Sequence, residues 1–226
     1  MIDTILFDLD NTILDFNKSE REALAKALTR LGISPAPQVL ARYSAINLAQ
    51  WKLLEQGKIT RAEVKARRFR FLFDEFGIDR TPEEANNLYE QFLETGADFI
   101  EGAEEALRGL SGRFRLYIVT NGTGAVQKRR IENAGISPYF QDVFISQEIG
   151  ADKPDKSFFD RCFLQIPDFH KERTVIIGDS LTSDIQGGKN AGIKTVWFNP
   201  RREPVDPSIL PDYEIHTLQD IFKLFS

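Results

Sequence analysis

The chain has 226 residues, of which 42% are hydrophobic and 28% charged, as in an ordinary globular protein that can bury a sizeable core. A net charge of -5 argues against a nucleic-acid backbone as a partner, because general binding there depends on clustered Lys and Arg. There is no signal-peptide pattern and no run of about 18 apolar residues, so we expect a cytoplasmic protein without a membrane partner. The only cysteine, Cys162, excludes an intrachain disulfide.

A short apolar run, Thr4–Phe7, predicts a buried strand at the start of the chain. Helix signals then follow one another as far as residue 98. Four helices are predicted, opened in turn by a Ser19/Glu22 capping box, by Pro37 in a helix that continues to Leu54, by a Thr60/Glu63 capping box, and by Thr81 and Pro82. Four successive helices need a shared core of their own, so we expect residues 16–98 to form an inserted helical bundle.

From residue 99 onward the pattern alternates between strands and helices. We expect helices at 103–110, 125–134, 156–165 and 184–191, strands at 116–120, 143–145, 174–177 and 195–198, a loop at 199–211 and a short C-terminal helix. This alternation predicts an α/β fold with a doubly wound parallel sheet, similar to a Rossmann core. Residues 1–15 and 99–226 would form this Rossmann-like core, and residues 16–98 would cover the edge where its first strand ends.

Four aspartates follow two of the apolar strands. Asp8 and Asp10 come directly after the first strand, and Asp179 and Asp184 come after the strand at 174–177. In open α/β sheets this carboxyl edge is where ligands bind. Crowded carboxylates repel one another, and a hard cation with oxygen ligands is the simplest way to keep them ionised. The sequence therefore predicts a Mg²⁺ site with a carboxylate left for chemistry.

Two further strand ends reach the same edge. The run LYIVTNG brings Thr120, Asn121 and Gly122 there, with a hydroxyl and backbone N–H groups suited to an anionic oxygen. Lys153 precedes Pro154, which disfavours helical geometry at the lysine. A lysine in this place can hold a carboxylate and neutralise a phosphate.

Together, DLDNT, VTN, KP and GDSLTSD resemble the four motifs of the haloacid dehalogenase superfamily, in the same order. The resemblance covers nearly the whole chain, and residues 16–98 resemble the helical cap of that family. The segments VFISQEIGADKPDKSFFD, SDIQGGKNAG and INLAQWKLLEQGKIT resemble the house-cleaning 5'-nucleotidases, which act on pyrimidine and non-standard nucleoside monophosphates.

The resemblance implies a role for each motif residue. Asp8 would be the nucleophile that forms an aspartyl-phosphate, and Asp10 the general acid and base, with its backbone carbonyl on the metal. Asp8 and Asp179 would bind Mg²⁺ directly, and Asp184 would be either a ligand or a partner of one. Thr120, Asn121, Gly122 and Lys153 would stabilise the transferring phosphoryl group.

Two residues of the predicted second helix are candidates for contact with the leaving group. Trp51 could stack on a nucleobase, and Asn47, one helical turn earlier, could hydrogen-bond to it, although a tryptophan here would also suit the core of the cap. We expect Arg67, Arg68 and Arg70 to form a solvated face, with the alternative that one of them reaches the substrate.

Several functions remain open from the sequence. The presence of Asp10 favours phosphate esters over the substrates of dehalogenases and phosphonatases, which lack a carboxylate two residues after the nucleophile. A sugar-phosphate phosphatase or phosphomutase is the alternative enzyme, and a receiver-like phospho-acceptor is the alternative outside enzymes. The expected partner is a small phosphate ester, most simply a nucleoside monophosphate, and the sequence leaves monomer and dimer both open.

Overall fold

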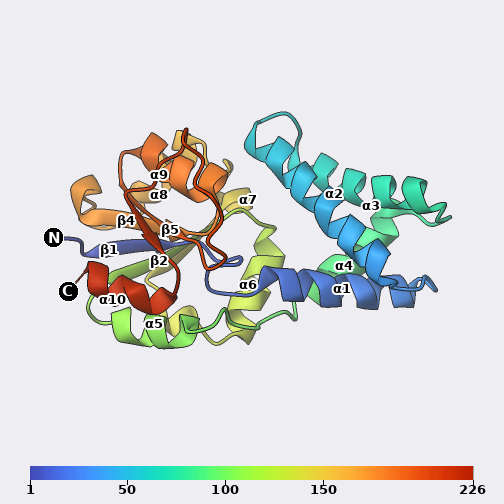
Figure 1. Cartoon of the computed structure of the whole chain (residues 1–226), viewed down its shortest axis with the longest axis horizontal. Coiled ribbons are helices and arrows are strands. Elements are labelled where there is room, and N and C mark those ends of the chain that lie inside the picture. Colours follow the sequence, from blue (N-terminus) through green and yellow to red (C-terminus); the bar gives the residue numbers. More distant parts are fainter. Residues whose placement is uncertain (226) are drawn as a thin grey trace.

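The computed structural model describes residues 1–225 and contains a six-stranded sheet in which every neighbouring pair of strands is parallel. The order is β3-β2-β1-β4-β5-β6, so the chain winds outward on both sides of the central strands β1 and β4 (Figure 1). The strands are β1 (Thr4–Phe7), β2 (Arg115–Thr120), β3 (Asp142–Ile145), β4 (Thr174–Gly178), β5 (Lys194–Phe198) and β6 (Tyr213–Ile215). The predicted doubly wound sheet is confirmed.

Helices cover both faces of the sheet. They are α5 (Ala103–Leu110), α6 (Gly124–Asn133), α7 (Ser146–Ile149), α8 (Lys156–Phe163), α9 (Gln186–Ala191) and α10 (Ile221–Leu224). Successive strand residues point to opposite faces, so Ile5 and Phe7 pack with α5 and α10, whereas Leu6 packs with α8 and α9. Figure 1 shows these two helical layers on either side of the sheet.

The sequence prediction differs from the structure at strand β6, at the short helix α7, which was not predicted, and at the start of α9. Strand β6 was not predicted and lies just beyond the loop expected at 199–211; it has only three residues, too few to show a period, and it is placed by pairing with β5. The helix expected at 184–191 starts with a π-helical turn at Leu181–Ile185, which is capped by the side chain of Ser180. Asp184 therefore lies inside this turn rather than at the start of the helix.

The remaining helices form a separate bundle, which we call the helical block. It comprises α1 (Phe16–Arg30), α2 (Pro37–Glu55), α3 (Arg61–Phe76) and α4 (Pro82–Leu93). Its apolar core combines residues from all four helices, including Leu24, Tyr43, Phe69 and Tyr89. Figure 1 shows the block beyond the edge of the sheet where β1 ends, beside α6.

The caps of these helices confirm one prediction and correct another. Thr60 and Glu63 form the predicted capping box at the start of α3, and Gly77, with φ of 63°, caps its C-terminal end. The Ser19/Glu22 capping box was wrong, because α1 begins one turn earlier. The side chain of Asp15 caps it by accepting a hydrogen bond from the backbone N–H of Lys18 at 2.9 Å.

The block is joined to the sheet by two neighbouring connections. The backbone N–H of Asp15 donates to the carbonyl of Asp98 at 2.8 Å, and that of Ile100 donates to Ile13 at 2.9 Å. The chain thus leaves and re-enters the sheet region side by side. Within residues 1–225, none of the helices is both long and apolar enough to cross a membrane.

Candidate active site

Three of the four predicted aspartates come together at the carboxyl ends of β1 and β4. One carboxylate oxygen from each of Asp8, Asp179 and Asp184 lies within 4.8 Å of the other two, so the three could share one cation. Asp8 and Asp184 are buried, whereas Asp179 is half-buried. The side chain of Asp10 is not part of this group, which leaves its carboxylate free for another task.

Lys153 lies beside this group and is 1% exposed. Its ammonium donates to Asp8 Oδ1 at 2.7 Å, to Asp184 Oδ1 at 2.6 Å and to the carbonyl of Val119 at 2.7 Å. Burial would lower the pKa of Lys153, but the charges of Asp184 and Asp8 outweigh it and raise that pKa. All three N–H groups are occupied, so the lysine orients Asp8 and Asp184 and contributes positive charge to its surroundings.

The charges of the aspartates are not balanced by Lys153 alone. Burial, followed by the charge of Asp184, raises the pKa of Asp8 well above its ordinary value despite the nearby lysine. The same two causes, in the same order, raise the pKa of Asp179 to about 7. Without a cation the group holds its negative charge poorly, and these oxygen ligands therefore suit a divalent metal.

Gly178, the last residue of β4, is required for the position of Asp184. A Cβ atom at Gly178 would lie 2.3 Å from the carboxyl carbon of Asp184. The carboxylate is held from its other side by the backbone N–H of Ser180, which donates to Asp184 Oδ2 at 3.1 Å. The sequence prediction gave Gly178 no role, because a close approach of this kind is visible only in the fold.

The end of β2 provides the predicted Thr120, Asn121 and Gly122. Thr120 is 1% exposed, and its hydroxyl oxygen accepts a hydrogen bond from Gln127 at 2.8 Å, so its own O–H can still donate. The side chain of Asn121 is paired with the backbone of Lys153, through bonds of 2.9 Å in both directions. Asn121 can therefore offer a ligand its backbone N–H, while its side chain fixes the loop that carries Lys153.

Two residues of α6 that the sequence prediction missed hold the carboxylate of Asp10. Gln127 Nε2 donates to Asp10 Oδ2 at 2.8 Å, and the guanidinium of Arg130 forms an ion pair with Asp10 Oδ1. Both side chains are buried. They lie at helical spacing on the same buried face of α6 as Val126 and Ile131. Polar residues on an otherwise apolar helix face were the sequence signal that could have identified them as buried and functional.

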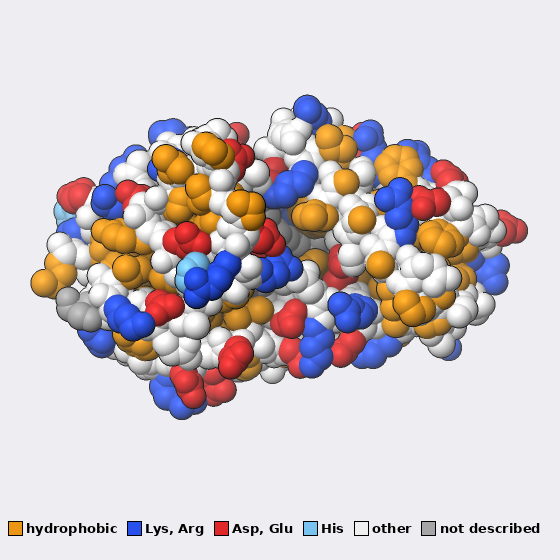
Figure 2. Space-filling model, in the orientation of Figure 1, with side chains coloured by type: hydrophobic (Ala, Val, Ile, Leu, Met, Phe, Trp, Pro, Cys, Tyr) orange, Lys and Arg blue, Asp and Glu red, His pale blue; other side chains and the backbone are white. Residues whose placement is uncertain are grey.

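A cavity of about 580 Å³ lies between the sheet and the helical block. It is lined by the residues described above, including Asp8, Asp10, Thr120, Lys153 and Asp179, and by side chains of α1 and α2. Figure 2 shows the surface hollowed where these two parts meet. The volume lies within the range of sites for small organic ligands.

Trp51 and Asn47 both line this cavity from α2, as the proposed recognition roles require. Trp51 is half-buried, packs beside Leu54, Ile59 and Val64, and has the guanidinium of Arg61 at 5.6 Å from its ring centre. Asn47 is 2% exposed. Its amide is already engaged with neighbouring side chains of the block.

Asn47 belongs to a buried polar network in the block. Its Nδ2 donates to Glu20 Oε1 at 2.7 Å, and its Oδ1 accepts from Arg68 Nη1 at 3.2 Å. Arg68 also donates to Asn86 at 2.6 Å and lies over the ring of Tyr89 at 4.7 Å. Burial raises the pKa of Glu20.

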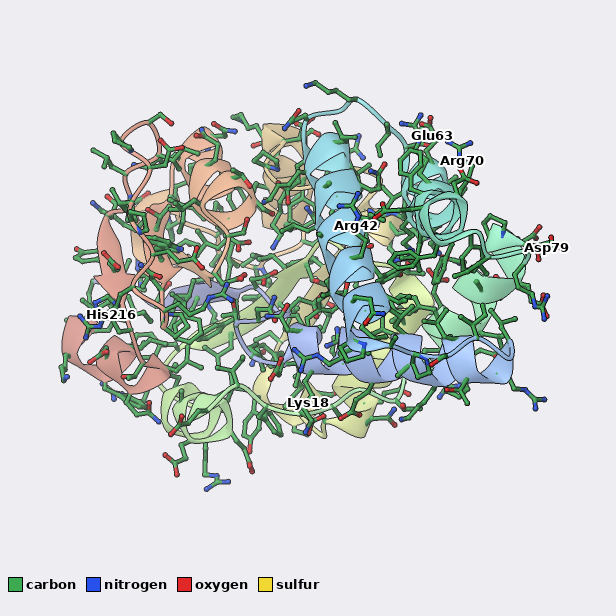
Figure 3. All side chains as sticks on the ribbon, turned by 45° about the vertical axis from the view of Figure 1, so that its right-hand side comes forward. Lys18, Arg42, Glu63, Arg70, Asp79 and His216 are labelled. Atoms are coloured by element: carbon green, nitrogen blue, oxygen red, sulfur yellow. The ribbon has the colours of Figure 1, made fainter. Side chains whose placement is uncertain are left out.

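The prediction of a solvated face at Arg67, Arg68 and Arg70 was wrong for Arg68. Arg68 is 3% exposed and lines the cavity, because it lies four residues from both Val64 and Leu72 on the buried stripe of α3. Arg70 is exposed and lies with Glu63 on the outer side of α3 (Figure 3). Arg67 pairs with Glu63.

Polar contacts close two sides of the cavity between the block and the sheet region. Lys52 of α2 donates to Thr182 and, at 3.3 Å, to Ser180, in the turn that carries Asp184. Arg61 of α3 donates to the carbonyl of Gly122 at 2.5 Å and forms an ion pair with Asp152. The block is therefore attached to three of the segments that carry the predicted site, those after β2, β3 and β4.

Comparison with known proteins places this geometry in a family. Residues 5–198 match the family of haloacid dehalogenase-like hydrolases. The HAD-hydrolase YfnB of Bacillus subtilis is 41% identical over 99% of this chain and 95% of its own. The crystal structure of YfnB bound to magnesium matches with a TM-score of 0.96, covering 100% of this chain and 99% of the other.

Two further relatives have names that state an activity. The pyrimidine 5'-nucleotidase PynA of Streptococcus pneumoniae is 40% identical over 96% of this chain and 92% of its own. The pyrimidine 5'-nucleotidase YjjG of Escherichia coli is 30% identical over 98% of this chain and 97% of its own. With the family match over most of its length, the chain belongs to the haloacid dehalogenase-like hydrolases.

Proposed function

We propose that the protein is a Mg²⁺-dependent phosphomonoester hydrolase, and more narrowly a 5'-nucleotidase acting on pyrimidine nucleoside monophosphates. The observation that carries the proposal is the arrangement at the end of β1. Asp8 lies in a three-carboxylate group against Lys153, and Asp10, two residues later, faces the same cavity from outside that group. The two relatives named as pyrimidine 5'-nucleotidases support the choice of substrate.

The residues present fit a magnesium ion. Asp8, Asp179 and Asp184 would hold it with carboxylate oxygens, and the backbone carbonyl of Asp10 is proposed as a further ligand. Burial, followed by the charge of Asp184, raises the pKa of Asp8 and of Asp179, and a bound cation would favour their ionised forms. When bound, the ion would supply charge stabilisation to a phosphoryl oxygen.

The proposed reaction has two steps, both at the carboxylates of Asp8 and Asp10, which follow β1. In the first, an oxygen of Asp8 attacks phosphorus, the bond to the ester oxygen breaks, and Asp10 gives that oxygen a proton. In the second, Asp10 takes a proton from water, the water oxygen bonds to phosphorus, and the bond from phosphorus to Asp8 breaks. Asp8 is regenerated and inorganic phosphate leaves.

The residues around Asp8 would bind the transferring group. The free O–H of Thr120 and the backbone N–H groups of Asn121 and Gly122 would donate to its oxygens. Lys153 would act through its charge, because its three N–H groups already bind Asp8, Asp184 and Val119. This extends the expected phosphate-binding role of Lys153 to the orientation of the nucleophile.

Residues 16–98 are proposed to act as a cap that selects the leaving group. Trp51 lines the cavity and is half-buried, so its ring can stack on a base. Asn47 is proposed to contribute to recognition together with Glu20, because the two side chains share a hydrogen bond beside the same cavity. Contacts of Lys52 and Arg61 with the sheet region would help exclude water.

A substrate screen tests the proposal. Phosphate release would be measured with excess Mg²⁺ from pyrimidine and purine nucleoside monophosphates, hexose phosphates and p-nitrophenyl phosphate. The highest kcat/KM is expected for a pyrimidine nucleotide. A preference for hexose phosphates would favour the sugar-phosphate alternative, and transfer of phosphate between sugar positions would indicate a mutase. A single phosphorylation of Asp8 without turnover would instead indicate a receiver-like phospho-acceptor.

A further inference from the structure

Arg130 occupies an unusual position for a charged residue. Its side chain is fully buried on α6, behind Asp10 and Gln127, both of which line the cavity. Burying a guanidinium is costly unless it is paired and hydrogen-bonded. A buried arginine that pairs with a proposed catalytic carboxylate, and does not itself line the cavity, calls for a functional explanation.

The guanidinium is held from several sides. Nε donates to the carbonyl of Gly96 at 3.1 Å, in the connection that returns from α4. Nη1 donates to Gln127 Oε1 at 3.1 Å, and the group lies 5.7 Å from the ring centre of Phe16, the first residue of α1. Arg130 is thus fixed by both connections of the helical block and by its own helix.

Asp10 is fixed in turn by this assembly. Arg130 donates to Oδ1 and Gln127 donates to Oδ2, so each oxygen of the carboxylate has one donor. Two donors on different oxygens determine the plane of a carboxylate, whereas one would leave it free to rotate. Each oxygen keeps a second lone pair, and Asp10 still lines the cavity.

We propose that Arg130 is a positioning residue that, with Gln127, holds the carboxylate of Asp10 toward the leaving-group oxygen. The inference rests on the proposed phosphatase function, in which Asp10 protonates that oxygen. Arg130 acts through Asp10 and does not touch the substrate. A misplaced acid slows only reactions that need a proton in the transition state, and this gives Arg130 a signature different from that of a residue needed for folding.

The test compares two substrates with different leaving groups. Uridine monophosphate expels an alkoxide and needs the acid, whereas p-nitrophenyl phosphate expels a phenoxide that is stable near neutral pH. Arg130→Met is expected to lower kcat/KM for uridine monophosphate about a hundredfold and that for p-nitrophenyl phosphate less than about threefold. Arg130→Lys, which keeps a cation near Asp10, should recover part of the first loss.

Controls separate this inference from the proposed function. Arg129→Met alters the exposed neighbouring arginine on α6 and should leave both kcat/KM values unchanged. We call the difference between the losses of kcat/KM on the two substrates the split. Asp10→Asn should show a larger split than Arg130→Met. A split for Asp10→Asn with an equal loss on both substrates for Arg130→Met would overturn the role of Arg130 alone. No split for Asp10→Asn would overturn the acid role itself, and the inference with it.

A second variant tests the inference if Arg130→Met does not fold. If Arg130→Met is not recovered as folded protein, Gln127→Leu removes the donor to the other oxygen of Asp10 and a donor to Thr120. It should show the same split between uridine monophosphate and p-nitrophenyl phosphate. Equal losses on both substrates would contradict the positioning of Asp10 by this pair.

Discussion

The amide nitrogen of Asn47 donates a hydrogen bond to the carboxylate of Glu20 at 2.7 Å, and both side chains are buried. Asn47→Ala would leave Glu20 Oε1 and Arg68 Nη1 without the hydrogen-bond partners that Asn47 provides, while Glu20 would keep Ser44 and Arg68 would keep Asn86. Because a buried unpaired polar group costs about 1–3 kcal/mol, we expect a clear loss of unfolding free energy in urea. Asn87→Ala, at an exposed position on α4, is the control and should have little effect. Equal stability of the two variants would contradict the structural role of Asn47.

Asp8 is the residue on which the covalent mechanism depends. Asp8→Asn keeps the shape of the side chain but removes the negative oxygen, so activity should fall by several orders of magnitude. The fold should survive, because burial already disfavours the charge of Asp8. Phosphate release and thermal unfolding would be measured together, with exposed Asp206→Asn as the control. Retention of more than about a hundredth of wild-type turnover would rule out attack by Asp8.

The effects of Mg²⁺ and Ca²⁺ on activity should differ, because the two ions differ in size and coordination number. Mg²⁺ is expected to activate, whereas Ca²⁺, which accepts up to eight ligands, should inhibit by disturbing the in-line geometry. Asp179→Ala should abolish activity, and Asp184→Ala should weaken the apparent affinity for Mg²⁺, measured from activity as a function of Mg²⁺ concentration. Full activity in excess chelator would exclude the metal.

Asp179 is expected to make the free energy of unfolding of the metal-free protein fall as the pH rises. Burial and the charge of Asp184 raise its pKa to about 7 in the folded protein without metal, whereas an unfolded aspartate titrates near 4. Between these values the folded state holds a proton that the unfolded state has lost. The contribution of Asp179 to the free energy of unfolding is therefore full below about pH 4 and is lost as the pH rises toward 7.

Urea unfolding between about pH 4 and pH 8 in the presence of a chelator would measure this slope. Asp179→Asn cannot titrate and should reduce it. Saturating Mg²⁺, which favours the ionised carboxylates, should stabilise the wild type most at the upper end of the range. A slope that is the same in Asp179→Asn and wild type would assign the effect to other groups.

Trp51 should distinguish nucleotides from simple esters. A stacked base contributes about 1–3 kcal/mol, so Trp51→Ala should lower kcat/KM for a favoured pyrimidine nucleotide roughly tenfold or more. Turnover of p-nitrophenyl phosphate should change little. Trp51→Phe keeps an aromatic face and should retain most of the preference. An equal loss on both substrates, or a protein that does not fold, would place Trp51 in the core of the block with Leu54 and Val64 instead.

The strand-end residues were predictable because their positions depend on local patterns. Asp8 and Asp179 follow short apolar runs that can only be buried strands, and parallel strands bring their carboxyl ends to one edge. The grouping of Asp8, Asp179 and Asp184 agrees with that reasoning, while their catalytic roles stay predictions. The Thr60 cap was predictable for the same reason, since its partner Glu63 is three residues away.

Other features depend on contacts between distant segments. Arg130 meets Asp10 across 120 residues, and Asn47 meets Glu20 across 27. Each lies on a helix whose sequence also allows a solvated polar face. The pairing of Asn47 with Glu20 depends on the packing of the helices within the block, and that of Arg130 depends on the packing of α6 against the end of β1. The sequence prediction therefore placed Arg68 on a solvated face and gave Arg130 no role.

The adjacent connections at Asp15 and Asp98 have a consequence for how such an enzyme can diversify. Because the two ends of the insertion lie side by side and are joined by short backbone pairings, an inserted segment of another length or shape could replace residues 16–98 without altering the register of β1 and β2, provided that it keeps the contacts of Phe16 and Gly96 with Arg130. If the inserted segment selects the substrate as proposed, exchanging it would change the substrates of the enzyme while keeping the aspartates that follow β1 and β4. Chimeras joined at these two positions would be the natural starting points for directed evolution of new activities.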